Sequence, residues 1–168
     1  EAWDPEGRTF DAIVSGESWH WVDPVAGAAK AAQVLRPRGL LAVFWNTGQP
    51  AAGLDEAFAE VYRRVLPEAF ASRLSKTTLE AAHSAMCANA IDGIRATGAF
   101  EEPEQWRFDW AQTYTREEWL DALQTSGGAL AEGQLARLME GVGDAIDDHG
   151  GSFTMNYLTF AVAAARRT

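Results

Sequence analysis

Two continuous apolar runs near the start of the chain predict buried strands. They cover residues 10–14 and 40–45, and nearly unbroken apolar runs are typical of strands buried on both faces of a sheet. Between them, Asp23 followed by Pro24 predicts a helix that continues to about Leu35, because aspartate caps helix N-termini and proline suits the first helical position. A strand, a helix and a strand at this spacing predict a parallel βαβ unit.

Helical periodicity dominates the rest of the chain. Asn46-Thr47-Gly48 is expected to turn the chain out of the second strand. Thr115 and Glu118 have the spacing of a capping box, which predicts a helix start. The predicted helices cover residues 51–66, 78–97, 115–126 and 131–147, with Gly127-Gly128 ending the third, and a final strand covers residues 153–164.

Aromatic residues alternate with polar ones over residues 105–110, which predicts a strand with one buried face. The aromatic positions are Trp106, Phe108 and Trp110. We expect these three residues, together with Trp119, to lie in the core.

Composition and charge narrow the function. The 168 residues are 47% hydrophobic, which predicts one packed domain. A formal net charge of -10 argues against nucleic acid as a partner, since that affinity rests on Lys and Arg. The single cysteine, Cys87, excludes a disulfide within residues 1–168. These residues show no signal-peptide pattern and no apolar run long enough to span a bilayer, so we expect neither feature. We therefore expect a cytoplasmic setting without membrane attachment.

Two stretches of sequence carry a resemblance to a known family. Residues 9–24 contain Phe-Asp, an apolar strand, a polar turn, Trp-His-Trp and Asp-Pro, and residues 34–41 read Val-Leu-Arg-Pro-Arg-Gly-Leu-Leu. This pattern resembles the middle of class I S-adenosylmethionine-dependent methyltransferases that act on small molecules. Residues 114–120 and 150–154 are similar to a bacterial branch of that family. Arg38 departs from the pattern, because the family usually has glycine there.

The resemblance implies a Rossmann-like α/β fold, of which residues 1–168 form the C-terminal portion of one domain. Parallel strands and an antiparallel edge hairpin are expected, with a helical insertion at about residues 51–98 that covers the active-site side. The family's Gly-rich cofactor loop has no counterpart in the sequence. Because Glu1-Ala2-Trp3 has no initiator Met and matches a loop inside the family's domain, the chain is expected to begin within a longer protein.

The resemblance also implies a function and a site. The implied activity is methyl transfer from S-adenosyl-L-methionine to a small organic acceptor, without a metal. Because the part of the domain that makes most cofactor contacts is missing, residues 1–168 by themselves need not be catalytically competent. Cofactor contacts are expected from Ser15, Gly16, Glu17 and Trp19, and Trp21 is expected to bind substrate. His20 follows the C-terminal end of a strand, where open sheets bind ligands, and is the candidate catalytic base or acceptor ligand. Each of these residues also has a purely structural explanation, and a histidine between two tryptophans is often a packed, hydrogen-bonded residue.

Other functions remain open. Residues 16–20 superficially resemble the nucleophile elbow of α/β hydrolases, but His20 stands where that turn needs a small residue. The histidines and Cys87 lack zinc-ligand spacing. A non-catalytic binding or pairing module is the stronger alternative, because the strand at residues 10–14 would expose a hydrogen-bonding edge through which two copies could form a homodimer.

Overall fold

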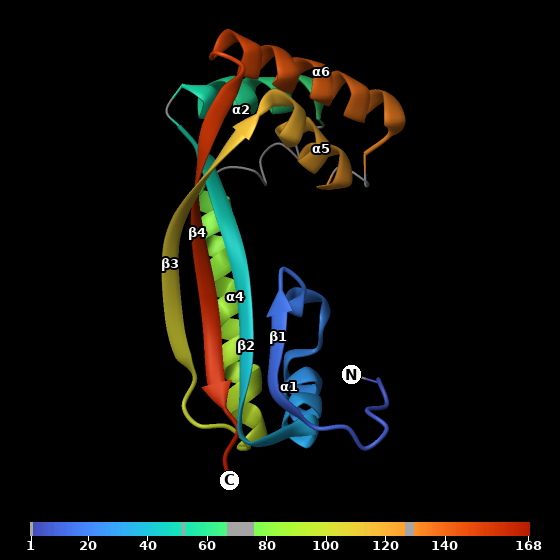
Figure 1. The fold of residues 1–168 in the computed structure, drawn as a ribbon, viewed down its shortest axis with the longest axis vertical. Helices are drawn as coiled ribbons and strands as arrows, with labels where there is room; N and C mark the ends of the chain where they lie inside the picture. The colour runs from blue at the N-terminus through green and yellow to red at the C-terminus, as the bar shows by residue number, and fades with distance from the viewer. Residues whose placement is uncertain (1, 52, 67–75, 127–129) are drawn as a thin grey trace. The chain divides into compact units, whose positions relative to one another are not determined.

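The chain forms a four-stranded sheet with helices, as the sequence predicts. The computed structural model describes residues 2–51, 53–66, 76–126 and 130–168 (Figure 1). Gly127 and Gly128, expected to end a helix, lie outside the described residues. The strand order is β1-β2-β4-β3. The elements are β1 (Phe10–Gly16), η1 (Trp19–Trp21), α1 (Pro24–Val34), β2 (Leu35–Pro50), α2 (Leu54–Val65), α4 (Lys76–Thr97), β3 (Glu104–Thr115), α5 (Arg116–Ser126), α6 (Glu132–Asp148) and β4 (Ser152–Ala165).

Strands β1 and β2 are parallel, which confirms the predicted βαβ unit. Ile13 lies beside Leu41 and the pairing continues to Gly16 and Phe44. The helix between these strands is α1, and Asp23 caps it by accepting hydrogen bonds from the backbone N–H groups of residues 25 and 26 at 3.0 and 2.7 Å. The aspartate and proline signal therefore located the helix start correctly.

Strand β4 runs antiparallel to both of its neighbours. Beside β2 and β4, Gly39 pairs with Arg166 and Ala51 pairs with Thr154. Residue numbers therefore rise along one strand where they fall along the other. Along β3 and β4, Thr113 bonds Thr154, and other side-chain contacts follow the same reversed register. This arrangement confirms the predicted antiparallel edge.

The second strand is longer than predicted. Asn46-Thr47-Gly48 does not turn the chain out of the sheet, because β2 continues to Pro50. Within the first unit described below, the Thr159 hydroxyl on β4 donates a hydrogen bond to the Asn46 side chain at 2.6 Å. Asn46, one of the residues that suggested a turn, is therefore bonded across the sheet.

The chain divides into two compact units. The first comprises Glu1–Thr47, Glu80–Phe108 and Leu158–Thr168, and the second comprises Gly48–Leu79 and Asp109–Tyr157. In the first unit, side chains of α1 and α4 pack with one face of the sheet. Its buried core includes Ala28 and Ala31 of α1, Ala90 and Ile94 of α4, and the strand residues Leu41, Val43, Trp45, Val162 and Ala164.

The aromatic residues of β3 are not in the core. Trp106, Phe108 and Trp110 are 39%, 53% and 43% exposed, so the expected burial is wrong. They occupy a strand at the edge of the sheet, where fewer neighbours cover each side chain. Trp119 behaves differently, since it is half-buried and packs against the core of the second unit.

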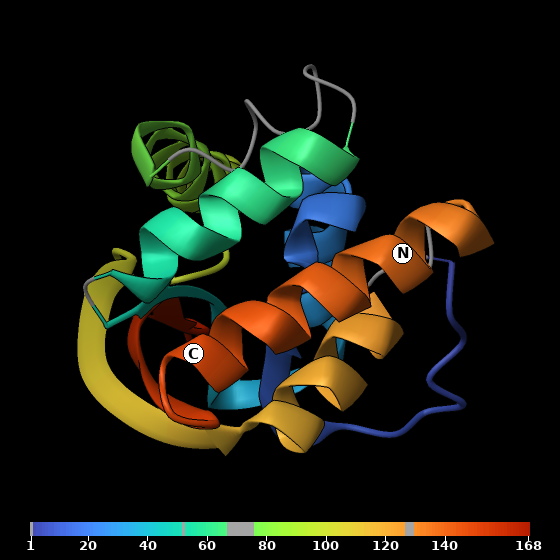
Figure 2. The same cartoon turned by 90° about the horizontal axis from the view of Figure 1, so that it is seen from above.

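Aromatic and aliphatic residues from the three helices α2, α5 and α6 build the core of the second unit, together with the adjoining ends of β3 and β4. Phe58, Trp119 and Phe153 make mutual ring contacts with centroids 5.3 to 6.4 Å apart. Figure 2 shows α2 and α6 lying side by side with α5 next to them. The unit therefore has a hydrophobic core of its own.

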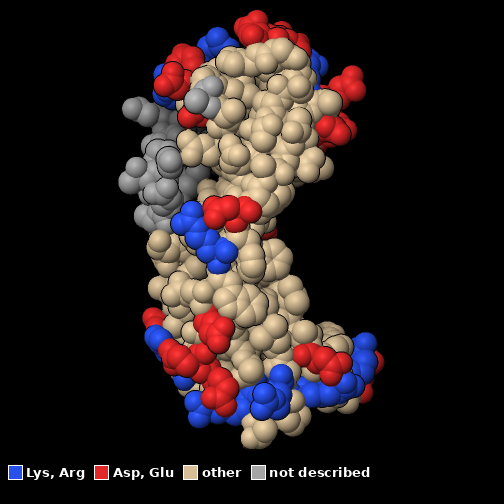
Figure 3. Space-filling view, turned by 60° about the vertical axis from the view of Figure 1, so that its left-hand side comes forward, with Lys and Arg blue, Asp and Glu red and all other residues tan. Residues whose placement is uncertain are grey.

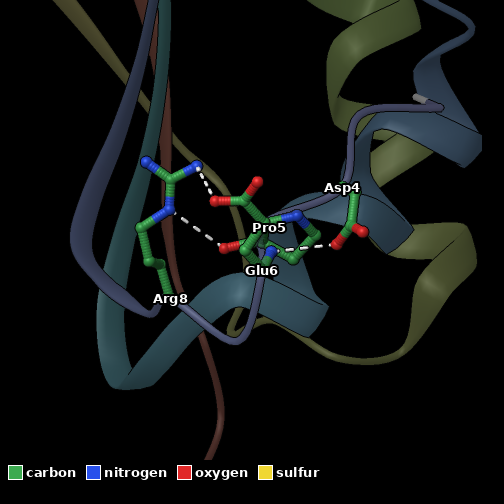
Figure 4. A network of polar contacts seen from close by, with 4 residues as sticks. All are labelled: Asp4, Pro5, Glu6 and Arg8. Atoms are coloured by element: carbon green, nitrogen blue, oxygen red, sulfur yellow. Dashed lines mark hydrogen bonds and ion pairs between the residues drawn. The ribbon is translucent and has the colours of Figure 1, made fainter.

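The chain enters β1 through an exposed turn at residues 4–8 (Figure 4). The Asp4 carboxylate accepts the Glu6 backbone N–H at 2.9 Å, and the Arg8 side chain donates to the Pro5 carbonyl at 3.0 Å. Glu6 and Gly7 have positive φ angles of 51° and 76°, which makes the turn tight.

On the face drawn in Figure 3, acidic and basic side chains are interspersed in small groups.

The capping box of α5 has formed. It is expected to make the free energy of unfolding depend on pH in the acidic range. Glu118 accepts hydrogen bonds from the Thr115 N–H at 2.9 Å and the Thr115 hydroxyl at 3.0 Å. These bonds, the backbone one first, hold the pKa of Glu118 below its ordinary value of 4.5. A carboxylate whose pKa is lowered by folding stabilises the fold above its ordinary pKa, and that contribution disappears as pH falls through the folded-state value.

We therefore expect Glu118→Gln, which keeps a capping side chain but cannot ionise, to lower the urea midpoint at neutral pH. The difference between the two proteins should shrink as the pH is lowered below 4.5. Urea unfolding followed by circular dichroism at several pH values measures it. A difference that is independent of pH would show that ionised Glu118 does not contribute.

Candidate functional site

The predicted site residues follow one another at the end of β1. Ser15 and Gly16 are the last two residues of β1, and Trp19, His20 and Trp21 form η1. The Ser15 and Ser18 hydroxyls are 2.8 Å apart and share a hydrogen bond. Glu17 has a φ of 51°, an uncommon backbone conformation for a residue other than glycine. Its N–H donates to the Phe44 carbonyl at 3.0 Å, and its carboxylate accepts the backbone N–H of Asn46. Glu17 thus ties the end of β1 to β2.

Gly16 occupies a position that a larger residue would disturb. A Cβ atom there would lie 2.7 Å from the ring of Phe44. The backbone of Gly16 is exposed, so glycine brings bare main chain to the surface at the end of the strand. Close approach of a ligand to backbone is a common reason for such a glycine.

Trp19 is buried against α1 and brings an unsatisfied donor into the site. Its side chain is 7% exposed, and its indole ring lies next to Gly27. Among the described residues, no acceptor pairs with the buried Nε1 of Trp19. A buried N–H without a partner is costly. This atom has almost no accessible surface, so a ligand acceptor would reach it only after the Trp19 side chain moved.

His20 is exposed, and one of its nitrogens is bound by the protein. The buried indole Nε1–H of Trp45 donates to His20 Nδ1 at 3.2 Å. The neighbouring Trp21 is 82% exposed, and its ring lies 4.8 Å from that of His20. Trp19, His20 and Trp21 are therefore neighbours in η1, but the Trp21 side chain is exposed to solvent.

Two cavities open beside this loop, both within the first unit. The larger, of about 310 Å³, is mainly apolar and lies between β1 and α1. Its lining includes Trp3, Phe10, Ile13, Trp19, Lys30 and Val34. The smaller, of about 120 Å³, is lined by Trp19, His20, Val22, Pro24, Trp45, Met86 and Asn89. Trp19 separates them and contributes to both walls.

Three residues of the smaller cavity have no counterpart among the sequence predictions. Trp45 was identified as a strand residue but not as the partner of His20. Met86 and Asn89 come from α4, far along the chain from the loop. No local pattern links a helix residue to a distant loop, so only the folded structure could have identified them.

Other reactive groups in the described part of the chain are poorly placed for chemistry. Burial raises the pKa of the Cys87 thiol, which keeps it protonated and weakly nucleophilic. Among the described residues, no group of three or more His, Cys, Asp or Glu side chains could hold a metal ion.

None of the described helices is both long and apolar enough to cross a membrane.

Comparison with known proteins finds similarity to methyltransferases. The chain is 36% identical over 59 residues to uncharacterized methyltransferases of Mycobacterium bovis and Mycobacterium tuberculosis, a match that covers 35% of this chain and 24% of each relative. A solved structure from Anaeromyxobacter dehalogenans, described as a type II methyltransferase, matches with a TM-score of 0.51 at 14% identity. No family model matches the chain.

These matches cover only part of each relative. The aligned region spans about a quarter of the length of the mycobacterial proteins. The structural match covers 94% of this chain and 65% of the Anaeromyxobacter chain. At 14% identity, that match concerns the fold.

Proposed function

Because this chain has the Rossmann-like fold of class I methyltransferases, we propose that it forms part of an S-adenosyl-L-methionine-dependent methyltransferase acting on a small organic acceptor. The observation that carries the proposal is the end of β1, where Trp19, His20 and Trp21 follow the carboxyl end of a strand that pairs in parallel with β2. Open α/β sheets bind ligands at that end of their strands.

The residues present fit one end of this cofactor. Adenine is planar and carries ring-nitrogen acceptors, which suit an apolar cavity of about 310 Å³ and the unpaired Nε1–H of Trp19. Trp19 would bind the ring. Ser15 and the exposed backbone of Gly16 line neither cavity, and they would contact a part of the cofactor that extends beyond the ring. Glu17 would act mainly by fixing the loop, because its carboxylate already binds the Asn46 N–H.

The cofactor, when bound, supplies a methyl group already activated by its sulfonium. What the protein must add is alignment of the acceptor with that methyl group and exclusion of water. His20 and Trp21 would contact an acceptor beside the loop. The acidic net charge supports an acceptor that is not a nucleic acid.

Calorimetric titration of S-adenosylhomocysteine tests the proposal. We expect saturable binding, and we expect Trp19→Phe to weaken it about three- to tenfold, the value of one neutral hydrogen bond. Trp21→Phe is the matched control, since Trp21 is largely exposed, and it should leave the affinity unchanged.

No binding by the wild-type chain would contradict the proposal and favour a non-catalytic pairing module. One observation supports that second candidate, since among the described residues no strand pairs with the outer edge of β1 and Val14 on that strand is 64% exposed. Such an edge can accept a strand from another chain, including a second copy.

A further inference from the structure

The contact between Trp45 and His20 fixes which nitrogen of the histidine carries hydrogen. An indole N–H can only donate, so Nδ1 of His20 must accept and must be unprotonated. The hydrogen of the neutral ring is therefore on Nε2. Trp45 is 1% exposed and belongs to the core of the first unit, so the donor that imposes this tautomer is held firmly.

The smaller cavity beside His20 suits an uncharged group. Among the described residues, its lining contains no Lys, Arg, Asp or Glu, and a charge placed there would lose hydration without gaining a counterion from them. Val22, Pro24 and Met86 supply apolar wall, while His20 and Asn89 supply polar atoms. A volume of about 120 Å³ is close to that of an engineered cavity, of roughly 150 Å³, that holds benzene.

We infer that His20 binds the methyl acceptor as a hydrogen-bond donor through Nε2–H, and that the acceptor carries an uncharged, ring-sized group with a carbonyl or ether oxygen. This inference rests on the function proposed above and narrows its substrate class. His20 is then a positioning residue, because with Nδ1 bound to Trp45 and Nε2 protonated it has no free lone pair with which to remove a proton. The alternative role, that of general base, does not fit this geometry.

The tautomer can be measured directly. Long-range ¹H–¹⁵N spectra at mildly alkaline pH distinguish protonated from unprotonated ring nitrogens, and the chain has only three histidines, so His20→Phe assigns the signals. We expect an unprotonated Nδ1 and a protonated Nε2 on His20, together with a shift of the Trp45 indole proton in His20→Phe. A protonated Nδ1, or an unmoved Trp45 signal, would overturn the inference.

The ligand class is tested with a neutral probe. Cyclohexanone offers a ring and one carbonyl oxygen, whereas cyclohexylamine has the same ring with a cationic donor. We expect cyclohexanone to shift the His20 Nε2–H signal on titration and cyclohexylamine to leave it in place. His20→Phe should weaken cyclohexanone binding about three- to tenfold, and His20→Gln, which retains an N–H donor, should recover most of the loss.

Equal binding of both probes, or unchanged cyclohexanone affinity in His20→Phe, would reject the proposed ligand class. Neither measurement uses S-adenosylhomocysteine. Loss of S-adenosylhomocysteine binding with these results intact therefore counts against the proposed function alone, while the reverse pattern counts against this inference alone.

Discussion

Replacing Gly93 with alanine is expected to lower the free energy of unfolding by about 1–3 kcal/mol, a typical cost of overpacking. A Cβ atom at position 93 on α4 would lie 2.5 Å from the carbonyl oxygen of Pro24 and 2.6 Å from its carbonyl carbon. These are backbone atoms in the first turn of α1, so no side-chain rotation can relieve the contact. The two helices would have to move apart, and urea unfolding of the variant measures the cost.

Gly133→Ala is the matched control for this effect. Gly133 is also helical, in α6, but among the described residues outside its own helical turn no atom lies within 4 Å of the Cβ that alanine would add. Because alanine is the better helix former, this variant should be stabilised by up to about 1 kcal/mol. A similar change in both variants would show that helix propensity, and not the approach of α4 to Pro24, determines the result at Gly93.

The second large effect is expected for Ile146→Ala. Ile146 is fully buried on α6 and belongs to the core of the second unit. Truncating such a side chain removes apolar burial and leaves a cavity, which typically costs about 2–5 kcal/mol. Thermal and urea unfolding measure the loss.

The control for Ile146→Ala is Glu140→Ala, on the same helix but at an exposed position, which should change stability by less than about 0.5 kcal/mol. If Ile146→Ala cost no more than Glu140→Ala, the packing of α6 on its neighbours would be wrong as described.

Local signals in the sequence predicted the fold most accurately. Asp23 with Pro24 and Thr115 with Glu118 each act within a few residues, and both helix starts are confirmed. Apolar runs likewise identified β1 and the centre of β2. The helix starts were predictable because the hydrogen bonds that cap them join residues that are neighbours in the chain. The strands were predictable from burial, since an unbroken apolar run indicates a strand covered on both faces.

The errors concern features that depend on distant parts of the chain. Gly48 resembled a turn residue, yet a Cβ there would lie 2.8 Å from the ring of Tyr157, so the glycine permits close packing of β4 on β2. The alternation at Trp106 and Phe108 correctly predicted a strand, but not the buried face, because every residue of β3 except Tyr114 is exposed. It could not show that the strand is at the edge of the sheet, where the aromatic face remains exposed.

The candidate site was predictable only in part. The sequence placed His20 and Trp19 after a strand, and the structure brings both to the wall of one cavity. It could not assign the tautomer of His20, because the donor is Trp45, 25 residues away. The tertiary structure determines which ring nitrogen of His20 is bonded to the protein. The chemical role of His20 depends on that assignment.

The position of β4 between β2 and β3 also bears on how quickly the chain can fold. Asn46 and its partner Thr159 are 113 residues apart, and closing so long a loop is slow compared with forming helices. The buried Val162 and Ala164 of β4 complete the core that α1 and β2 begin. During synthesis, β1 and β2 therefore expose apolar side chains until β4 has left the ribosome. A chaperone that binds these strands in that interval would protect the chain from aggregation.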